Sequence, residues 1–382
     1  MSDSKTEMGG YQDRFWYPRF WDGMTLRAWL KLLKAGKYRV EPIRWAMALI
    51  ITGLAVCVNS PCAWRQRRVY GKKILNTKLA GAPIFIIGHW RSGTTLLHEY
   101  MIRDLQFSFA DTYACFAPEH FITTRFTLRR IAALLMPTKR PMDNMEAGLD
   151  RPQEDEFALA AMGLPSPYRN IIFSNNGMNI DTDYLTLRNV SDKDRHTWLD
   201  GLDLFLKTLT FQNPGKRIVL KSPPHTGRIK TLLERYPDAK FIHIHRNPYS
   251  IFPSTYNLFM RLAKDEGAQN PKGVGMEEYV LSTFDTMYSA FEEDIKQLAP
   301  NQFCDIAFKD LTSAPVATLE RIYQTLELDR FGDVKSIFEQ YAASQKGYKK
   351  NKFSINPELK EKIAQRWTGY FERYGYDTEP VV

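Results

Sequence analysis

A glycine-rich stretch in the first quarter of the chain combines residues that bind anions. It reads "IFIIGHWRSGTTLL", residues 84–97, with Gly88 and Gly93 separated by four residues. That spacing is typical of phosphate-binding loops between a strand and a helix, where backbone N–H groups and the helix dipole attract an anion. Nucleotide triphosphatases continue with Lys and then Ser or Thr, whereas this chain has Thr94 and Thr95. The loop therefore predicts an anion site without the usual lysine.

Arg91 supplies a cation from inside this loop, and the two threonines add hydroxyl donors. Enzymes that transfer a γ-phosphoryl group use Mg²⁺ to offset its charge. A sulfuryl group carries less charge, so protein donors alone can serve its transfer. The loop therefore fits a phosphosulfate better than ATP, and we expect no metal ion.

A second stretch, "FIHIHRNPYSIFPSTYN", predicts another anion site. Its apolar strand delivers Arg246 at the carboxyl end, and Ser254 follows eight residues later in the next helix. Ligands of open α/β sheets bind at the carboxyl ends of the strands. Two anion sites at two strand ends indicate a nucleotide with phosphates at both its 5′ and 3′ positions.

These motifs resemble those of the sulfotransferases that use 3′-phosphoadenosine-5′-phosphosulfate (PAPS), and most closely the bacterial type related to tyrosylprotein sulfotransferases. "GHWRSGTT" is similar to the family's loop P-[KR]-S-G-T-T, with Trp90 in place of the proline. "HRNPYSIFPST" is similar to R-[DN]-P-x-x-x-x-x-S, and "LKSPPH", residues 220–225, to a strand-end segment with a lysine. The resemblance covers roughly residues 80 to 375.

The resemblance implies a metal-independent, in-line transfer of a sulfuryl group from PAPS to a hydroxyl group. Arg246 and Ser254 would hold the 3′-phosphate, and Lys221 would stabilise the charge that builds on the leaving phosphate. Arg91 and its neighbours would hold the 5′-phosphate and the sulfuryl group. The loop residues in this implied set are Arg91, Ser92, Gly93, Thr94 and Thr95.

A basic segment near the C-terminus, "QKGYKKN", has two interpretations. By resemblance, it would close over the adenosine through Tyr348 and Lys349. The alternative is an ordinary solvated run of charges.

The reaction also needs a base that takes the proton of the acceptor hydroxyl. Glu154, Asp155 and Glu156 form an acidic run at the end of a Pro-rich stretch, residues 140–156, which we expect to be a loop over the site. Neighbouring carboxylates raise one another's pKa, which suits a base. We expect Glu154 to be the base, and Glu156 to be the next candidate. Asp111 lies about where tyrosylprotein relatives place a glutamate and is a further candidate.

Short apolar runs alternate with amphipathic stretches over the rest of the chain. We expect strands at residues 84–87, 217–220, 241–245 and 303–308. We expect helices at residues 94–104, 121–136, 226–236, 249–264, 277–298, 315–326 and 357–374. This alternation predicts a three-layer α/β fold, with a P-loop-like parallel sheet flanked by helices.

The charge of the chain is concentrated at its beginning. The net charge is +9 over 382 residues. The first 80 residues hold 15 Lys and Arg against 5 Asp and Glu, a net +10, so the remaining residues carry −1. This uneven distribution disfavours a nucleic-acid binder. Four cysteines with neither metal nor disulfide spacing favour a reducing, cytoplasmic setting.

The first 80 residues predict a helical extension of the catalytic domain. We expect a helix over residues 25–35, and a second, uncharged stretch from residue 45 to 64 whose dense apolar part, residues 47–58, ends at Asn59, Ser60 and Pro61. It falls short of the about 20 apolar residues of a spanning helix. Two interpretations remain: peripheral contact with the inner face of the membrane, or a buried helical hairpin that packs on the catalytic domain.

The sequence thus predicts a basic helical region, residues 1–80, and a sulfotransferase domain, residues 81–382. A hydroxyl-bearing small molecule is the expected acceptor, and a lipid or other hydrophobic alcohol is favoured if the first region contacts a membrane. One alternative is a P-loop kinase or nucleotide triphosphatase, which would need magnesium and a lysine where Thr94 stands. Another is a non-catalytic, membrane-associated nucleotide-binding module.

Overall fold

A parallel sheet of five strands forms the centre of the molecule. The computed structural model describes residues 19–136, 148–345 and 355–378. The strands are β1 (Ile84–Ile87), β2 (Phe107–Phe109), β3 (Arg217–Lys221), β4 (Lys240–His245) and β5 (Phe303–Ala307). Their order is β2-β3-β1-β4-β5, and every neighbouring pair is parallel. The four strands expected from the sequence are confirmed, and β2 is an additional edge strand.

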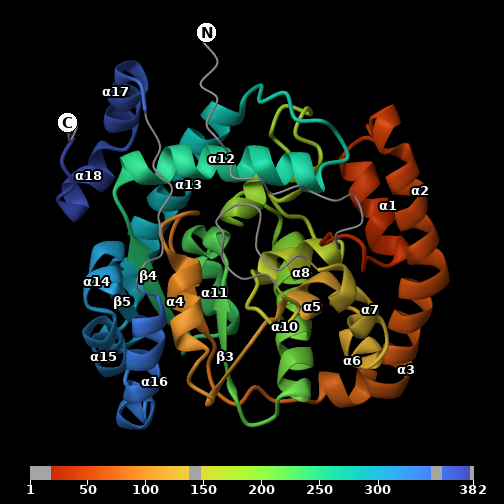
Figure 1. Ribbon diagram of the computed structural model, residues 1–382, viewed down its shortest axis with the longest axis horizontal. Helices are drawn as coiled ribbons and strands as arrows, with labels where there is room; N and C mark the ends of the chain where they lie inside the picture. Colours follow the sequence, from red (N-terminus) through yellow and green to blue (C-terminus); the bar gives the residue numbers. More distant parts are fainter. Residues whose placement is uncertain (1–18, 137–147, 346–354, 379–382) are drawn as a thin grey trace.

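Helices cover both faces of this sheet (Figure 1). Ile84 and Ile86 of β1 pack into a core with α4 (Thr94–Met101), α15 (Pro315–Thr325) and α16 (Phe331–Ser344). Phe85 and Ile87 point the other way, into a core with α10 (Asp192–Gln212), α11 (Ile229–Arg235) and α13 (Met276–Asp294). The predicted three-layer α/β fold is therefore confirmed.

Further helices surround these layers. They are α5 (Thr112–Phe116), α6 (Phe121–Thr124), α7 (Leu128–Leu135), α8 (Asp155–Ala161), α9 (Arg169–Ile172), α12 (Pro248–Glu266), α14 (Phe308–Ser313), α17 (Pro357–Arg366) and α18 (Thr368–Tyr374). The single helix expected over residues 357–374 is wrong, because Trp367 leaves the helical conformation and its buried ring stacks 3.8 Å from that of Phe284. Residues 121–136 likewise divide between α6 and α7.

The N-terminal region folds into one short and one long helix. The predicted short helix is confirmed as α1 (Leu26–Ala35), with the Thr25 hydroxyl accepting a hydrogen bond from the Ala28 N–H. The long helix runs without a break from Pro42 to Leu75, through α2 (Trp45–Leu54), a π-helical turn (Ala55–Asn59) and α3 (Ser60–Leu75).

The expectation that Asn59, Ser60 and Pro61 end this helix is wrong. Ser60 Oγ donates to the Ala55 carbonyl at 2.7 Å, within the π-helical turn. The buried Asn59 side chain donates to the Asp22 carbonyl at 2.7 Å and the Met24 carbonyl at 2.9 Å, in the segment before α1. Because the turn and these two side chains satisfy local polar groups, the helix accommodates the proline and continues.

One face of the long helix belongs to a core that the N-terminal region shares with the rest of the chain. Ile51 and Ala55 pack in a cluster with Trp29 of α1, and with Ala160 and Ala161 of α8. The alternative in which the helices of this region pack on the catalytic domain is therefore met on this face of the long helix, while its other face is exposed. The division of the chain at residue 80 remains a prediction.

Two half-buried carboxyl groups lie where this region meets the end of α12. Burial raises the pKa of Glu266 to about 8, against the attraction of Arg19. Burial likewise raises the pKa of Asp22 to about 6. In the unfolded chain both groups ionise at their ordinary, lower pKa values, so the folded state binds more protons than the unfolded state between about pH 4.5 and 8. Folding therefore becomes less favourable as the pH rises, up to about pH 6 for Asp22 and up to about pH 8 for Glu266.

We predict that Glu266→Gln removes part of this pH dependence. The free energy of unfolding of the variant, relative to the wild type, should be higher at pH 8 than at pH 5 by on the order of 1 to 2 kcal/mol, since the side chain is only partly buried. Denaturant unfolding at the two pH values measures this. The exposed Glu339→Gln is the matched control and should show no such difference; equal differences for both variants would contradict the prediction.

Candidate anion-binding and catalytic site

The anion loop follows β1 at the centre of the sheet and leads into α4. Gly88 and Gly93 have φ values of 140° and 112°, which other residues rarely adopt. A Cβ atom on Gly88 would lie 2.5 Å from the Ile244 carbonyl oxygen of β4, and one on Gly93 would lie 2.3 Å from the Phe308 ring. Both glycines are therefore required by close packing against β4 and the start of α14.

The two predicted anion sites are neighbours. Arg91 Nε donates to Ser254 Oγ of α12 at 2.8 Å, and Arg246 Nη1 donates to the Arg91 carbonyl oxygen at 3.0 Å. The Arg246 guanidinium also lies 4.5 Å from the centre of the Phe308 ring, against which Gly93 packs. Because β1 and β4 are adjacent parallel strands, their carboxyl ends bring the two arginines to one continuous cationic surface.

The remaining loop residues present further donors. Thr94 and Thr95 open α4, at the positive end of its dipole. Ser92 is buried, and its hydroxyl has no hydrogen-bond partner among the described residues. Such an orphaned donor, inside a loop rich in N–H groups, fits an oxyanion ligand. Tyr348 and Lys349, expected at the adenosine, lie outside the described residues.

The two histidines near the loop contribute no positive charge at neutral pH. Burial lowers the pKa of His89 and of His98 to about 3. His89 Nδ1–H accordingly donates to the Trp90 carbonyl oxygen at 3.0 Å as part of a neutral ring. The cationic character of the loop therefore comes from arginine and lysine side chains.

Lys221 and Glu154 meet beside the loop. Lys221 is the last residue of β3, and its Nζ lies 2.6 Å from Glu154 Oε1. The Lys221 side chain is 1% exposed and that of Glu154 is 14% exposed, so the carboxylate is the more solvent-accessible member of the pair.

A chain of hydrogen bonds connects this pair to the loop. The hydroxyl of Tyr168 donates to Glu154 Oε2, and the Trp90 indole N–H donates to the Tyr168 oxygen at 2.9 Å. Burial and the neighbouring Glu154 charge raise the pKa of Tyr168 well above its usual value. Tyr168 therefore remains a donor, and it orients Glu154 from the side opposite Lys221.

Glu156 occupies a different environment from Glu154. Its carboxylate forms an ion pair with the Arg228 guanidinium, and both side chains are fully buried. It also accepts a hydrogen bond of 2.5 Å from Ser166 Oγ. This geometry favours a structural role over the expected role of second candidate base.

Asp155, the first residue of α8, is buried as well, against the segment that follows β3. Its carboxylate lies 2.7 Å from His225 Nε2 and accepts a hydrogen bond of 2.8 Å from Ser222 Oγ. Burial alone would raise the pKa of Asp155, but His225 and Ser222 hold it below the usual value. The argument that these clustered carboxylates raise one another's pKa therefore fails for Asp155, because it has partners of its own.

The segment "LKSPPH" joins this network to the anion loop. It continues from β3 into a 3₁₀ turn (Pro223–Gly227), where Thr226 Oγ1 accepts a hydrogen bond of 2.7 Å from the Gly88 N–H. The sequence singled out this segment for its lysine, but gave no signal for the partners from distant elements.

Asp111, the further candidate base, caps α5 by accepting a hydrogen bond from the Ala114 N–H at 2.7 Å.

Comparison with known proteins identifies the family of the chain. A family model described as "Sulfotransferase family" matches residues 83–333. The chain is 37% identical over 364 residues to the omega-hydroxy-beta-dihydromenaquinone-9 sulfotransferase Stf3 of Mycobacterium bovis, with 95% of this chain and 93% of the relative covered, and the Stf3 of Mycobacterium tuberculosis gives the same values.

Solved structures show the same fold. The sulfotransferase STF9 from Mycobacterium avium superposes with a TM-score of 0.64 at 15% identity, covering 93% of this chain and 97% of that one. STF1 from M. tuberculosis superposes with a TM-score of 0.62 at 18% identity, covering 90% and 92%.

The two glutamates that flank Asp155 should respond differently to substitution. We predict that Glu156→Gln lowers the free energy of unfolding by about 3–5 kcal/mol, because it leaves the buried Arg228 without its counter-charge. Glu154→Gln should cost less, since the Glu154 carboxylate is partly exposed, whereas that of Glu156 is fully buried. Denaturant unfolding of both variants tests this, and equal stability losses would contradict the structural role of Glu156.

Proposed function

The chain belongs to the sulfotransferase family, and we propose that it transfers a sulfuryl group from PAPS to the hydroxyl group of a lipid-like acceptor. The observation that carries the proposal is the meeting of Arg91, Arg246 and Lys221 at the carboxyl ends of three adjacent strands, next to the Glu154 carboxylate. Neither the kinase alternative nor the non-catalytic alternative is retained, because the family and the relatives are sulfotransferases.

The donor fits the two connected anion sites. Arg246 and Ser254 would hold the 3′-phosphate, while Arg91, Ser92 and the N–H groups at the start of α4 would hold the 5′-phosphosulfate. The contact between Arg91 and Ser254 supports one ligand that spans both sites, since it leaves no separating wall between them. Thr94 and Thr95 would add hydroxyl donors to the phosphosulfate.

The chemistry follows from the Lys221–Glu154 pair. The acceptor oxygen attacks the sulfur atom, and the bond between sulfur and the bridging phosphate oxygen breaks with its electron pair remaining on the nucleotide. Lys221 stabilises the negative charge that builds on that oxygen. Glu154 accepts the proton of the acceptor hydroxyl, while Tyr168 holds the carboxylate in place.

The acceptor class is inferred from the most similar curated relatives considered above. By its name, Stf3 acts on an omega-hydroxylated menaquinone derivative, a long hydrophobic molecule with a hydroxyl group. An identity of 37% that extends over 95% of the chain supports an acceptor of the same chemical class. We infer that the enzyme acts in the cytoplasm, at the inner face of the membrane, where a lipid-like acceptor would be accessible to it.

We predict that the purified chain transfers label from radioactive PAPS to an omega-hydroxylated prenylquinone, and not to the same quinone without the hydroxyl. Lys221→Met and Glu154→Gln should each lower kcat by about a hundredfold or more. Arg246→Met should mainly raise the KM for PAPS, because it binds the part of the nucleotide remote from the reaction. Calorimetry with the desulfated nucleotide provides the independent measurement of donor binding. An absence of both binding and label transfer would overturn the proposed function.

We further predict that turnover does not depend on a divalent cation. Within the described ranges, no group of three or more His, Cys, Asp or Glu side chains could hold a metal ion, and three cationic side chains serve the donor instead. Treatment with a chelator should leave the initial rate unchanged within assay error. A loss of activity that added Mg²⁺ restores would contradict a metal-independent transfer.

A further inference from the structure

The long helix Pro42–Leu75 has an exposed face that is apolar over half of its length. Large hydrophobic side chains on that face include Trp45, Leu49, Ile50, Leu54 and Val56, with Leu49 72% and Ile50 64% exposed. The only strongly polar residues between positions 45 and 61 are the buried Asn59 and the half-buried Thr52 and Ser60. Soluble proteins seldom leave so continuous an apolar surface open to water.

By length and composition this helix could cross a membrane. Its most apolar 18-residue window has a mean hydropathy of 1.8, and 22% of that window is buried. Its contacts with the rest of the fold exclude that arrangement, because they extend along nearly the whole helix. They join Arg44 to the Lys264 carbonyl at 2.9 Å, Thr52 to the Trp29 indole at 3.0 Å, and Gln66 to the Ile122 N–H at 3.0 Å, and they end with the Tyr70 ring 5.7 Å from that of Phe211.

These contacts span about 39 Å of helix, at 1.5 Å per residue. A helix attached to a polar domain over that distance cannot be surrounded by lipid. Its apolar face can instead enter a bilayer surface while the opposite face stays on the protein, as interfacial helices do. In Figure 1 the helix runs along the right-hand edge of the molecule, with its outer side uncovered.

The charges around this face match an anionic surface. The helix Pro42–Leu75 contains six Lys and Arg and no Asp or Glu. Five of the six follow the apolar half on α3, where Arg65, Arg67, Arg68, Lys72 and Lys73 are all exposed. An apolar segment followed by a basic one suits the boundary between acyl chains and acidic headgroups.

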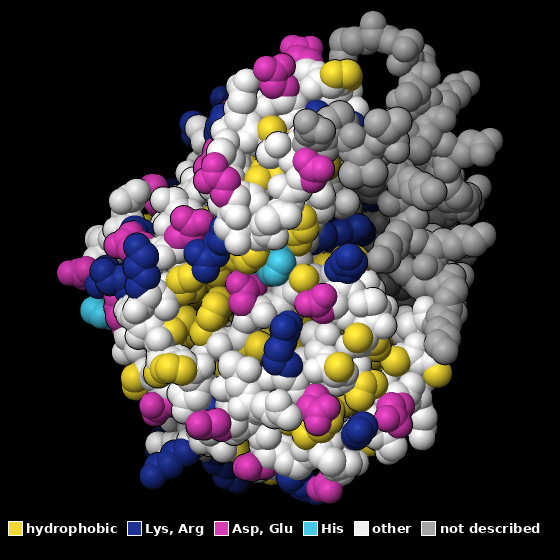
Figure 2. Space-filling model, turned by 90° about the vertical axis from the view of Figure 1, so that its left-hand side faces the viewer, with side chains coloured by type: hydrophobic (Ala, Val, Ile, Leu, Met, Phe, Trp, Pro, Cys, Tyr) yellow, Lys and Arg dark blue, Asp and Glu magenta, His cyan; other side chains and the backbone are white. Residues whose placement is uncertain are grey.

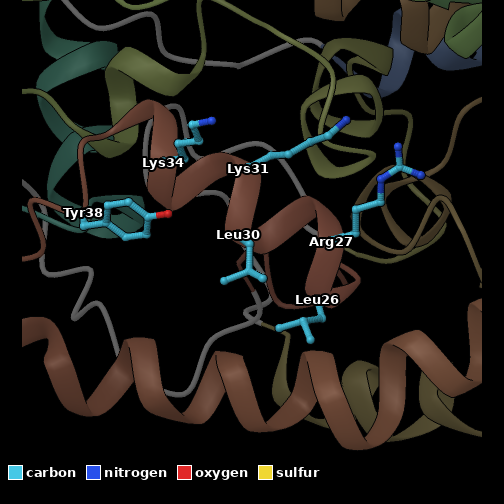
Figure 3. A pocket seen from close by; sticks show the side chains of 6 residues that line it. All are labelled: Leu26, Arg27, Leu30, Lys31, Lys34 and Tyr38. Carbon is cyan, nitrogen blue, oxygen red and sulfur yellow. The ribbon is translucent and has the colours of Figure 1, made fainter.

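A groove on α1 repeats this combination beside the long helix. It is lined by Leu26, Leu30 and Tyr38 together with Arg27, Lys31 and Lys34. Figure 3 shows the two leucines pointing toward the long helix and the three basic side chains pointing away from it. The groove is therefore apolar on one side and cationic on the other, as a lipid with an acidic headgroup requires.

The opposite side of the molecule does not share this pattern. The side formed by α14, α15 and α16 carries Lys and Arg interspersed with Asp and Glu (Figure 2). By contrast, α7 exposes Ile131 and Leu134 alongside Arg130. It follows α6, which packs on α3, so a second apolar and basic segment lies on the same side of the molecule (Figure 1).

The long helix is connected to the Glu154 carboxylate, the proposed base, through α8. The cluster that holds Ile51 and Ala55 also contains Ala160 and Ala161 of α8. Glu154 is the residue that precedes α8, a helix of 7 residues and thus about 10 Å in length. One short helix therefore connects the base to the element that would rest on the bilayer.

We propose that the exposed face of the Pro42–Leu75 helix, with the adjoining groove on α1, docks on the surface of an anionic phospholipid bilayer. The helix lies in the plane of the membrane and positions the site to receive its acceptor from the lipid phase. The part concerning the acceptor rests on the function proposed above, whereas the docking itself does not require catalysis.

Sedimentation of the full chain with vesicles tests the docking. The protein should bind vesicles of phosphatidylglycerol and phosphatidylcholine, and bind those of phosphatidylcholine alone at least tenfold more weakly. The double variant Leu49→Glu, Ile50→Glu should reduce binding to the mixed vesicles at least tenfold. Its matched control is Leu105→Glu, Val274→Glu, which changes two side chains that are each 75% exposed elsewhere on the molecule. Arg67→Gln and Arg68→Gln should each weaken binding by roughly fivefold, and only to the anionic vesicles.

Three results would overturn the docking. The first is unchanged vesicle binding by the Leu49, Ile50 variant. The second is retention of the protein in membranes after alkaline carbonate extraction, which would show a spanning helix. The third is a dimer in solution that this variant dissociates. The variant should keep its turnover of a short, water-soluble hydroxyl acceptor while losing turnover of the vesicle-borne lipid. If no acceptor is sulfated but the variant still loses vesicle binding, the proposed function fails and the docking stands.

Discussion

The proposed donor site requires three cationic side chains to lie within reach of one nucleotide that has an anionic group at each end, without strong repulsion between the three. The parallel sheet solves this by ending β3, β1 and β4 side by side, so that Lys221, Arg91 and Arg246 arrive from three neighbouring strands. Each has a neutral or anionic neighbour: Glu154 beside Lys221, Ser254 beside Arg91, and the Phe308 ring beside Arg246. Such partners lower the repulsion between the cations before an anionic ligand binds.

Local chemistry explains why the anion loop and the strands could be predicted from the sequence. The spacing of Gly88 and Gly93 encodes a turn that other residues cannot make, and short apolar runs in an α/β chain have few other uses. The positions of Arg246 and Ser254 also follow from neighbouring residues, because Arg246 directly follows a strand and Ser254 lies in the helix that comes next. These features needed no knowledge of distant contacts.

Features that depend on distant partners could not be predicted in the same way. The sequence presents Glu154, Asp155 and Glu156 as equivalent neighbours, yet helix geometry sends them to different surroundings. Glu156 meets Arg228 from 72 positions along the chain, and Asp155 meets His225 from 70. Tyr168, which orients Glu154, carries no signal at all in its own segment. The predicted end of the long helix was wrong for a related reason. Asn59 suggested a helix end because it is polar, but its side chain donates to carbonyl groups of the segment before α1, and the helix continues.

The same long helix combines a face that packs on the fold with a face that is compatible with lipid. One side is committed to the fold through the cluster it shares with α8, so its apolar residues stabilise the protein there. The other side retains an apolar composition that stability alone does not require, since exposed positions on a helix are ordinarily polar. Because all the charged residues of the helix are basic, the proposed contact with acidic lipid explains this composition. In the proposed arrangement, the fold brings the Glu154 carboxylate, one helix away, toward the phase in which a hydrophobic acceptor would dissolve.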